Sequence, residues 1–244
     1  MSEEIYTKEI WVCYADCDRQ KRLKPSAILK YFTESAGQQL VEKGLTYECL
    51  QSRKIAFFLS KVVFRIIGEP IRANGDTRIT LRTWATGCKG VCFTRDFEIL
   101  DETGVQRIVG NSYWVVVNPE TRSIQKPSLI DIGIPFGRAG ENFPDICRLR
   151  PKMPVYCYSQ QILYSMIDCN GHANNTVYAD LAVNAAPEYD STQLHEFEIH
   201  FLKETVLGDC LELCREEWDE NSVLMSAMGE EKPFFLARMQ FKKA

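Results

Sequence analysis

The chain has 244 residues, which is enough for one large domain or for two small domains that share a core. Hydrophobic residues make up 45% of it and charged residues 25%, so hydrophobic burial can stabilise the fold without disulfides or metals. The formal net charge of −4 argues against nucleic acid as the main partner.

The N-terminal segment, MSEEIYTKEIW, lacks a basic stretch followed by an apolar core, so we expect no secretory signal. No apolar run reaches the length of a membrane span. The ten cysteines form no C-x-x-C pair, and the three histidines do not complete a zinc pattern. We therefore expect a cytoplasmic protein with reduced thiols, no metal site and no cofactor.

The first half opens with a short polar segment, Tyr14-Ala-Asp16-Cys17-Asp18, and a helix. We expect this helix to begin near Pro25 and to end near Gly44. Its apolar stripe has helical spacing and comprises Ile28, Leu29, Phe32, Ala36 and Leu40. Strands follow, and one period-two series among them comprises Phe93, Arg95, Phe97 and Ile99.

A proline-rich segment divides the chain. It contains six prolines and three interspersed glycines, which predict an irregular connection rather than a helix or a central strand. We therefore predict an N-terminal domain over residues 1–118, a linker over 119–154 and a C-terminal domain over 155–244.

The second half repeats the order of features. Matching Asp16 to Asp168 gives an offset of 168 − 16 = 152, and matching Gly75 to Gly208 gives 208 − 75 = 133. A second helix, starting near Asn174 or the next residue, is again followed by alternating strands and turns. The common order indicates a duplication and an α+β architecture, with an antiparallel sheet that wraps one central helix in each half.

One segment of the second half carries the candidate chemistry. Asp168, Asn170, His172 and Asn174 occupy every second position, so in an extended segment their side chains share one face and Cys169 points away. The helix that follows presents unpaired backbone donors, which can polarise a carbonyl oxygen. Each residue alone is typical of a turn, a helix cap or a structural histidine. Together they favour a functional site over that reading.

The stretch Asp168-Cys-Asn170-Gly-His172-Ala-Asn174-Asn175-Thr-Val-Tyr178 resembles the D-x-N-x-H-x-N-N-x-x-Y motif of acyl-acyl carrier protein thioesterases, the plant-type enzymes and their bacterial relatives. The similarity in layout extends over essentially the whole chain, including the tandem halves and the linker. It implies a tandem double hotdog fold. It also implies hydrolysis of a fatty-acyl thioester of acyl carrier protein (ACP) to free fatty acid and carrier thiol, as in fatty acid biosynthesis.

The resemblance further implies a catalytic carboxylate in a segment of the form aromatic-basic-basic-Glu-Cys. Phe201-Leu202-Lys203-Glu204-Thr205 is the matching segment, so Glu204 receives that role, although Leu202 and Thr205 depart from the pattern. Without the resemblance, a solvated edge residue is the favoured reading of Glu204. A thiol nucleophile at position 205 is excluded by the threonine.

We expect water to attack the thioester, with no obligatory covalent intermediate. His172 or Glu204 accepts the water proton, and the sequence does not decide between them. Asp168 orients the imidazole or holds Asn170, which can donate to a carbonyl or position the water. Cys169 is the competing nucleophile, and a structural thiol is its favoured role.

The first half has Asp16, Asp18 and Gln20 at the matched positions, and Gln20 cannot act as a base. We therefore expect one catalytic site per chain, with the first half shaping the acyl pocket. The predicted substrate contacts are Asn174, Asn175, Phe57 and Phe58, although capping of the helix by either asparagine and core packing of the phenylalanines are also consistent with the pattern. The basic residues beside the first-half motif are either a solvated face or a docking site for an acidic ACP: Arg19, Lys21, Arg22 and Lys24.

Alternatives remain at this point. The same site could hydrolyse acyl-coenzyme A, or the hotdog scaffold could bind acyl groups without catalysis; a hotdog hydratase or dehydratase fits the motif less well. The sequence does not define the preferred acyl chain, and it leaves a homodimer open.

Overall fold

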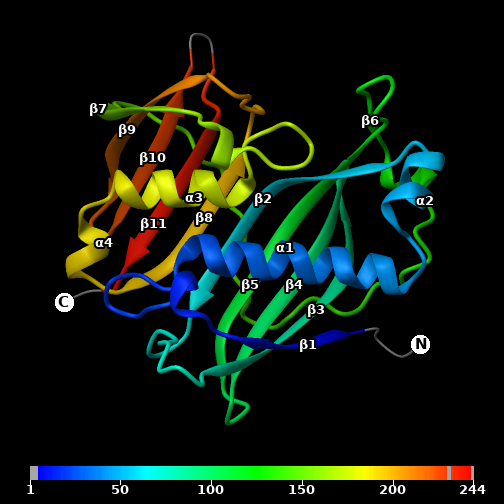
Figure 1. Ribbon diagram of the computed structural model, residues 1–244, viewed down its shortest axis with the longest axis horizontal. Helices are drawn as coiled ribbons and strands as arrows, with labels where there is room; N and C mark the ends of the chain where they lie inside the picture. The colour runs from blue at the N-terminus through cyan, green and yellow to red at the C-terminus, as the bar shows by residue number, and fades with distance from the viewer. Residues whose placement is uncertain (1–4, 230–231, 243–244) are drawn as a thin grey trace.

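The computed structural model describes residues 5–229 and 232–242. These residues form one 11-stranded antiparallel sheet and four α-helices (Figure 1). The strands are β1 (Tyr6–Trp11), β2 (Ala56–Ile66), β3 (Arg78–Lys89), β4 (Cys92–Asp101), β5 (Gln106–Val117), β6 (Ile124–Gln125), β7 (Val155–Gln161), β8 (Leu194–Phe201), β9 (Cys210–Asp219), β10 (Ser222–Met228) and β11 (Phe235–Phe241). The helices are α1 (Pro25–Glu42), α2 (Tyr47–Ser52), α3 (Asn175–Asn184) and α4 (Glu188–Ser191).

The two halves share this sheet. Its order is β1-β3-β4-β5-β2-β8-β11-β10-β9-β7, with the short β6 paired to β5. The first five strands belong to the first half and the last five to the second. β2 and β8 join the halves in a register that runs from Lys61 opposite His200 to Arg65 opposite Glu196. The predicted wrapping of each helix is therefore realised by one continuous sheet.

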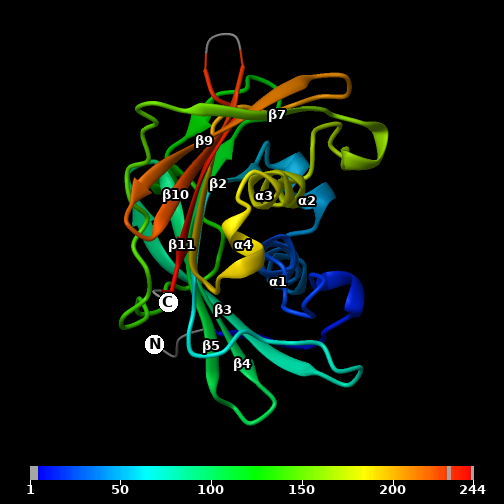
Figure 2. The same ribbon diagram turned by 90° about the vertical axis from the view of Figure 1, so that its left-hand side faces the viewer.

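The two long helices lie side by side on one face of the sheet (Figures 1 and 2). α1 begins at Pro25, whose missing N–H costs nothing in the first turn, and the chain leaves the helix through Gly44 at a φ of 76°. Both ends agree with the prediction from the sequence. α3 is shorter because Pro187 follows it closely.

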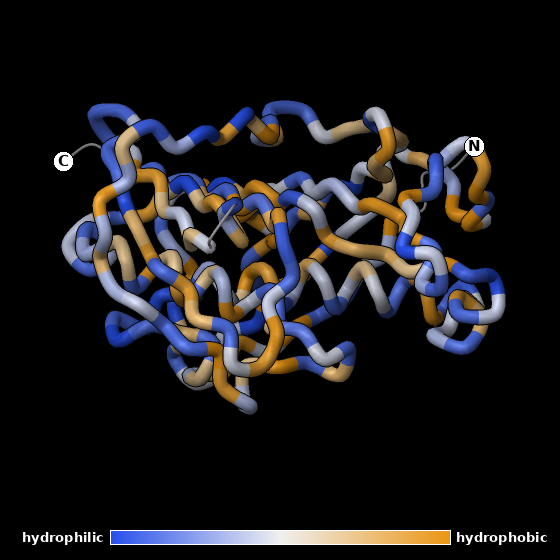
Figure 3. The backbone as a smooth tube through the Cα atoms, turned by 90° about the horizontal axis from the view of Figure 1, so that it is seen from above, coloured by the Kyte–Doolittle hydropathy of each residue, from blue (hydrophilic) through white to orange (hydrophobic). Residues whose placement is uncertain are grey.

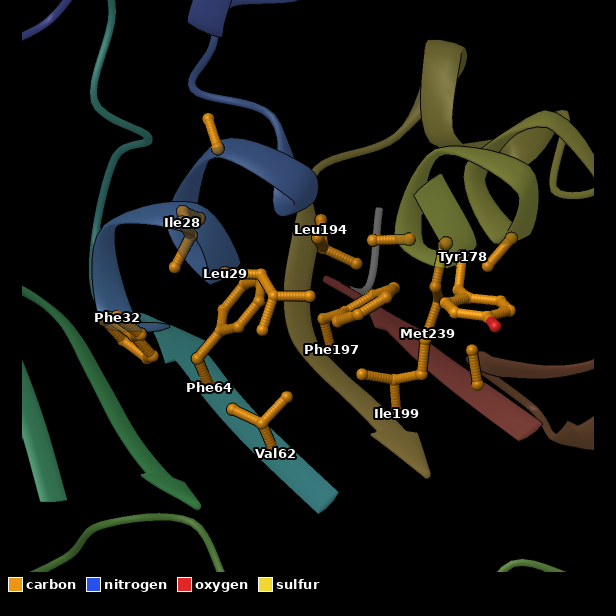
Figure 4. Packing of buried hydrophobic residues seen from close by; sticks show 14 of the residues in the cluster. Ile28, Leu29, Phe32, Val62, Phe64, Tyr178, Leu194, Phe197, Ile199 and Met239 are labelled. Carbon is orange, nitrogen blue, oxygen red and sulfur yellow. The ribbon is translucent and has the colours of Figure 1, made fainter. Parts of the chain in front are cut away.

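The main core lies between the helices and the sheet (Figure 4). Phe32 of α1 stacks on Phe97 of β4, and Phe64 of β2 stacks on Phe197 of β8 with ring centroids 5.4 Å apart. The second contact crosses the junction between the halves, so their cores are continuous. In Figure 3, hydrophobic and hydrophilic segments alternate along the chain, as expected of strands with one face in a core.

The proline-rich segment has little regular structure besides β6 and a 3-10 turn at Pro127–Leu129. Residues 130–134 contribute three buried isoleucines to a second apolar cluster at the end of the first half. Further on, the Gly140 N–H donates to Asp96 and the Cys147 N–H donates to Glu198, across the sheet face opposite the helices (Figure 2). The domain boundaries at residues 118 and 155 remain a prediction.

Among the described helices, none combines the length and the apolar character that crossing a membrane requires.

Candidate active site

A cavity of about 970 Å³ lies between the two halves. Its second-half wall is formed by most residues of the 168–175 segment, Tyr178 and residues 201–204, and its first-half wall by parts of α1, α2, β2, β4 and β5. A cavity of this volume is typical of sites that enclose a small organic ligand. The predicted polar residues and the predicted acyl-pocket half therefore border the same space.

His172 and Glu204 form the central polar pair of this wall. The Nε2 atom of His172 lies 3.2 Å from Oε2 of Glu204. The side chains are 31% and 48% exposed, respectively, so both remain accessible to water and substrate. The two residues predicted from the sequence as alternative bases are thus in direct contact.

The segment that carries His172 is a tight turn rather than an extended strand. The Asp168 N–H donates to the His172 carbonyl at 2.8 Å, and Ile167 bridges Ala173 across the turn. One Asp168 carboxylate oxygen accepts the Asn170 N–H at 2.8 Å, while Gly171 adopts a φ of 81° that favours glycine. Asp168 therefore shapes the turn that presents the imidazole.

The expected alternation of faces is accordingly wrong for this segment. Cys169 is exposed and lines the cavity together with Asp168, Asn170 and His172. It neither points away from them nor is buried as a structural thiol. The competing nucleophile thus has to be tested by substitution.

The loop that carries Glu204 is held against this turn by its neighbour Thr205. The Ala173 N–H donates to the Thr205 carbonyl at 2.9 Å, and the Thr205 hydroxyl lies 2.8 Å from the Tyr178 hydroxyl on α3. Thr205 is fully buried, and its own N–H donates to the Tyr178 hydroxyl at 3.2 Å. Burial raises the pKa of Tyr178, which keeps the phenol protonated. These contacts place the carboxylate of residue 204 beside the imidazole.

The two asparagines at the start of α3 have different positions. Asn174 is the N-cap, and its side-chain oxygen accepts the Thr176 N–H and hydroxyl. It does not line the cavity, so the predicted substrate contact is not supported for Asn174. Asn175 does line the cavity. Its N–H finds no acceptor among the described residues, and it is the helix-start donor that remains for a substrate oxygen.

The apolar part of the cavity lies in the first half. Phe57 and Phe58 line it, as expected, together with Phe93, Trp114 and Ile132. Lys203 and Arg122 also line it. The cavity therefore combines a polar wall from the second half with an apolar wall suited to a hydrocarbon chain.

Comparison with known proteins identifies the family. The model of the acyl-ACP thioesterase N-terminal domain matches residues 3–128, and that of the acyl-ACP thioesterase C-terminal domain matches residues 158–238. The chain belongs to the acyl-ACP thioesterase family. Its members are thioester hydrolases, so the predictions of family and enzyme class are confirmed.

Solved structures share the fold. An acyl-ACP thioesterase from Bacteroides thetaiotaomicron is 20% identical with a TM-score of 0.87, over 99% of this chain and 100% of the other. The 12:0-ACP thioesterase from Umbellularia californica is 14% identical with a TM-score of 0.82, over 98% and 97% of the two chains. These likenesses confirm the tandem double hotdog. No curated protein sequence matches the chain.

In this acyl-ACP thioesterase, the first half contains a turn equivalent to the one that carries His172. The Asp18 N–H donates to the Arg22 carbonyl at 2.8 Å, as Asp168 does to His172, and the helices that follow begin at Pro25 and Asn175. The offset is therefore 168 − 18 = 150, so the offset of 152 inferred from sequence is wrong by two residues.

With the corrected register, Arg22 rather than Gln20 corresponds to His172. The carboxylate is missing as well: the Leu23 N–H donates to Ile71 as that of Ala173 does to Thr205, so Pro70 stands where Glu204 stands. Arginine does not act as a base at neutral pH. The first-half turn thus lacks both members of the pair.

The predicted docking cluster lies beside α4 rather than at the polar wall. Arg22 is only 7% exposed, pairs with Asp18 at 2.7 Å and donates to the carbonyls of Tyr189 and Thr192. The prediction that Arg22 contacts the carrier is therefore wrong, because its guanidinium is buried and already donates to groups within the fold. Arg19 pairs with Asp190, while Lys21 is exposed and Lys24 is half-buried. For these three, docking remains a prediction.

Three residues of the site were not singled out from the sequence. The anchoring pair Tyr178 and Thr205 joins segments far apart in the chain, and its only signal was the place of each residue in the family motifs. Arg95 lines the cavity, and its signal was a charged residue at an apolar position of a period-two strand.

Proposed function

We propose that the chain hydrolyses the thioester of a fatty-acyl ACP by general-base attack of water, releasing free fatty acid and the carrier thiol. The observation that carries this proposal is the His172–Glu204 pair, 3.2 Å apart on the wall of a largely apolar cavity. The pair supplies proton acceptors, and the cavity supplies a place for the chain whose carbonyl is attacked.

In this mechanism the pair accepts a proton as the water oxygen bonds to the thioester carbon. The carbonyl oxygen gains negative charge, and the N–H of Asn175 and the Asn170 amide are the nearby donors that would stabilise it. Collapse of the tetrahedral intermediate breaks the carbon–sulfur bond, and the proton returns to the leaving thiolate. Asp168 acts indirectly, by closing the turn that presents His172.

Further parts of the proposal concern the carrier and the compartment. Lys203 and Arg122 border the cavity and would attract an acidic carrier. All ten cysteines have free thiols, which is consistent with a reducing cytoplasm. We place the reaction in fatty acid biosynthesis because the substrate of the proposed reaction is an acyl-ACP.

The test is thiol release from matched acyl chains on ACP and on coenzyme A. We expect the higher kcat/KM on ACP. Faster release from coenzyme A would reassign the carrier. Binding of acyl-ACP without any release would instead identify a non-catalytic acyl-binding protein.

A further inference from the structure

The cavity contains a buried arginine that the mechanism above does not use. Arg95 lies on β4 and shares a strand face with Phe97 and Ile99, both fully buried in the main core. It is only 7% exposed, yet it lines the cavity beside Phe93 and Trp114. A charged side chain at this place is expensive for the fold.

Arg95 has no carboxylate partner among the described residues. Its guanidinium donates to the neutral Thr83 hydroxyl at 3.1 Å. The adjacent Asp96 faces the other side of the sheet, where it accepts from Asn111 and Gly140. Burial lowers the pKa of Arg95 to about 10, so the side chain remains a cation at neutral pH.

Two other arginines with little exposure, the buried Arg22 and the partly buried Arg238, behave differently. Arg22 pairs with Asp18, and Arg238 pairs with Glu196 and Glu198. Each of these cations is compensated within the fold, as buried charges in proteins usually are. The donors of Arg95 that Thr83 does not use therefore remain available to a molecule in the cavity.

Arg95 also lies well away from the reacting thioester. In the sheet order, β4 is separated from β8 by β5 and β2, which is roughly 14 Å at the usual strand spacing. Glu204 follows shortly after β8. A group bound by Arg95 is thus on the acyl chain rather than at the carbonyl that is attacked.

We infer that the preferred substrate is an acyl chain that carries an acceptor oxygen beyond the thioester, as a hydroxyl, oxo or carboxylate group, and that Arg95 binds this oxygen. A plain hydrocarbon chain displaces water from the guanidinium but has no acceptor for its N–H groups. An oxygen on the chain restores a charge-assisted hydrogen bond. Arg95 is then a specificity-determining residue of the cavity. This inference rests on the proposed hydrolase function.

The experiment compares acyl-ACPs of one chain length: saturated, hydroxylated at successive positions, oxo-substituted and terminally carboxylated. We expect at least one oxygenated chain to exceed the saturated chain in kcat/KM by about tenfold or more. Arg95→Met should abolish this preference while the saturated chain is still hydrolysed. Arg82→Met, which removes an exposed arginine of β3 outside the cavity, should retain it.

Equal or higher kcat/KM for the saturated chain across the panel would overturn the inference, as would a preference that survives in Arg95→Met. The unsubstituted protein provides a second measurement if that variant does not fold. Free fatty acids should then bind the wild-type protein more tightly when they carry the preferred oxygen, and equal affinity would count against it. Absence of thiol release from every chain would overturn the hydrolase proposal, while the binding comparison would still decide the role of Arg95.

Discussion

Arg22 in the first half occupies the position that His172 occupies in the second. Each carbonyl accepts the N–H of the aspartate four residues earlier at 2.8 Å. His172 faces Glu204 and the cavity, whereas Arg22 binds Asp18 and the chain around α4. The same turn thus supports chemistry in one half and the contact between the halves in the other.

The first prediction concerns the polar pair. His172→Gln and Glu204→Gln should each lower kcat/KM by roughly 10²–10⁴-fold, because each removes part of the proton acceptor. The double variant should lose little more than the worse single variant, since the residues act as a unit. Steady-state kinetics on acyl-ACP measures this, with circular dichroism as a folding control. If the two single losses in log(kcat/KM) added fully in the double variant, the result would contradict a shared role of His172 and Glu204.

The second prediction concerns Tyr178 and Thr205 as positioning residues. Tyr178→Phe and Thr205→Val remove the hydrogen bond that holds the Glu204 loop, so kcat should fall while KM changes little. Tyr158→Phe is the matched control, because its hydroxyl donates to the Leu181 carbonyl of the same helix outside the cavity. A Thr205→Ser variant should recover most of the activity. An unchanged kcat in both Tyr178→Phe and Thr205→Val would rule out the positioning role.

The third prediction concerns Arg22. Arg22→Met removes the guanidinium that neutralises Asp18 and donates to its Oδ2 and to two carbonyls, so the free energy of unfolding should fall by about 3–5 kcal/mol. Arg19→Met, at an exposed pair, should leave the urea midpoint unchanged. Equal stability of the two variants would contradict the buried contact.

The fourth prediction concerns pH and Asp16. Burial alone would raise the pKa of Asp16, but hydrogen bonds from Lys30 and Tyr31 outweigh it and hold that pKa below its ordinary value. The contribution of ionised Asp16 to the free energy of unfolding is fully present at pH values above the ordinary carboxyl pKa. It is lost as the pH falls through the lowered pKa of Asp16 in the folded protein.

Asp16→Asn should therefore reduce the free energy of unfolding by about 2 kcal/mol at neutral pH, and the difference from wild type should shrink in acid. Urea titrations at several pH values measure this. Asp76→Asn, at a loose exposed pair, should show no such dependence. A difference that grows in acid would reverse the assigned sign.

The fifth prediction concerns Cys169. Its exposed thiol lines the cavity, but water attack does not require it. Cys169→Ser should keep kcat/KM within about threefold of wild type, since it removes no proton acceptor. Mass spectrometry of the stalled reaction should find no acyl group on this cysteine. Loss of turnover together with an acylated thiol would favour covalent catalysis.

The sequence predicted local features well. Pro25 and Gly44 bound α1 as expected, and strand alternation placed the buried Phe93 and Phe97 on one face correctly, because these patterns depend on neighbours in the chain. Contacts between distant segments were not predictable in this way. The burial of Arg22 depends on Tyr189 and Thr192, which lie far along the chain, so its charge was read as a surface feature.

The same limit applies to the site. The approach of Glu204 to His172 was expected only through the family motif, because no periodicity relates the two positions. The turn at Asp168 was misread as extended, since the alternation of polar residues also fits a compact loop closed by its own carboxylate.

The pairing of β2 with β8 makes the two hotdog units dependent on each other. Either unit expressed alone would present a long bare strand edge, with Phe64 or Phe197 uncovered beside it, and such edges recruit other chains. The tandem chain thus holds, as an internal contact, what two separate hotdog chains would form as a subunit interface, and only one unit has to supply the His172–Glu204 pair.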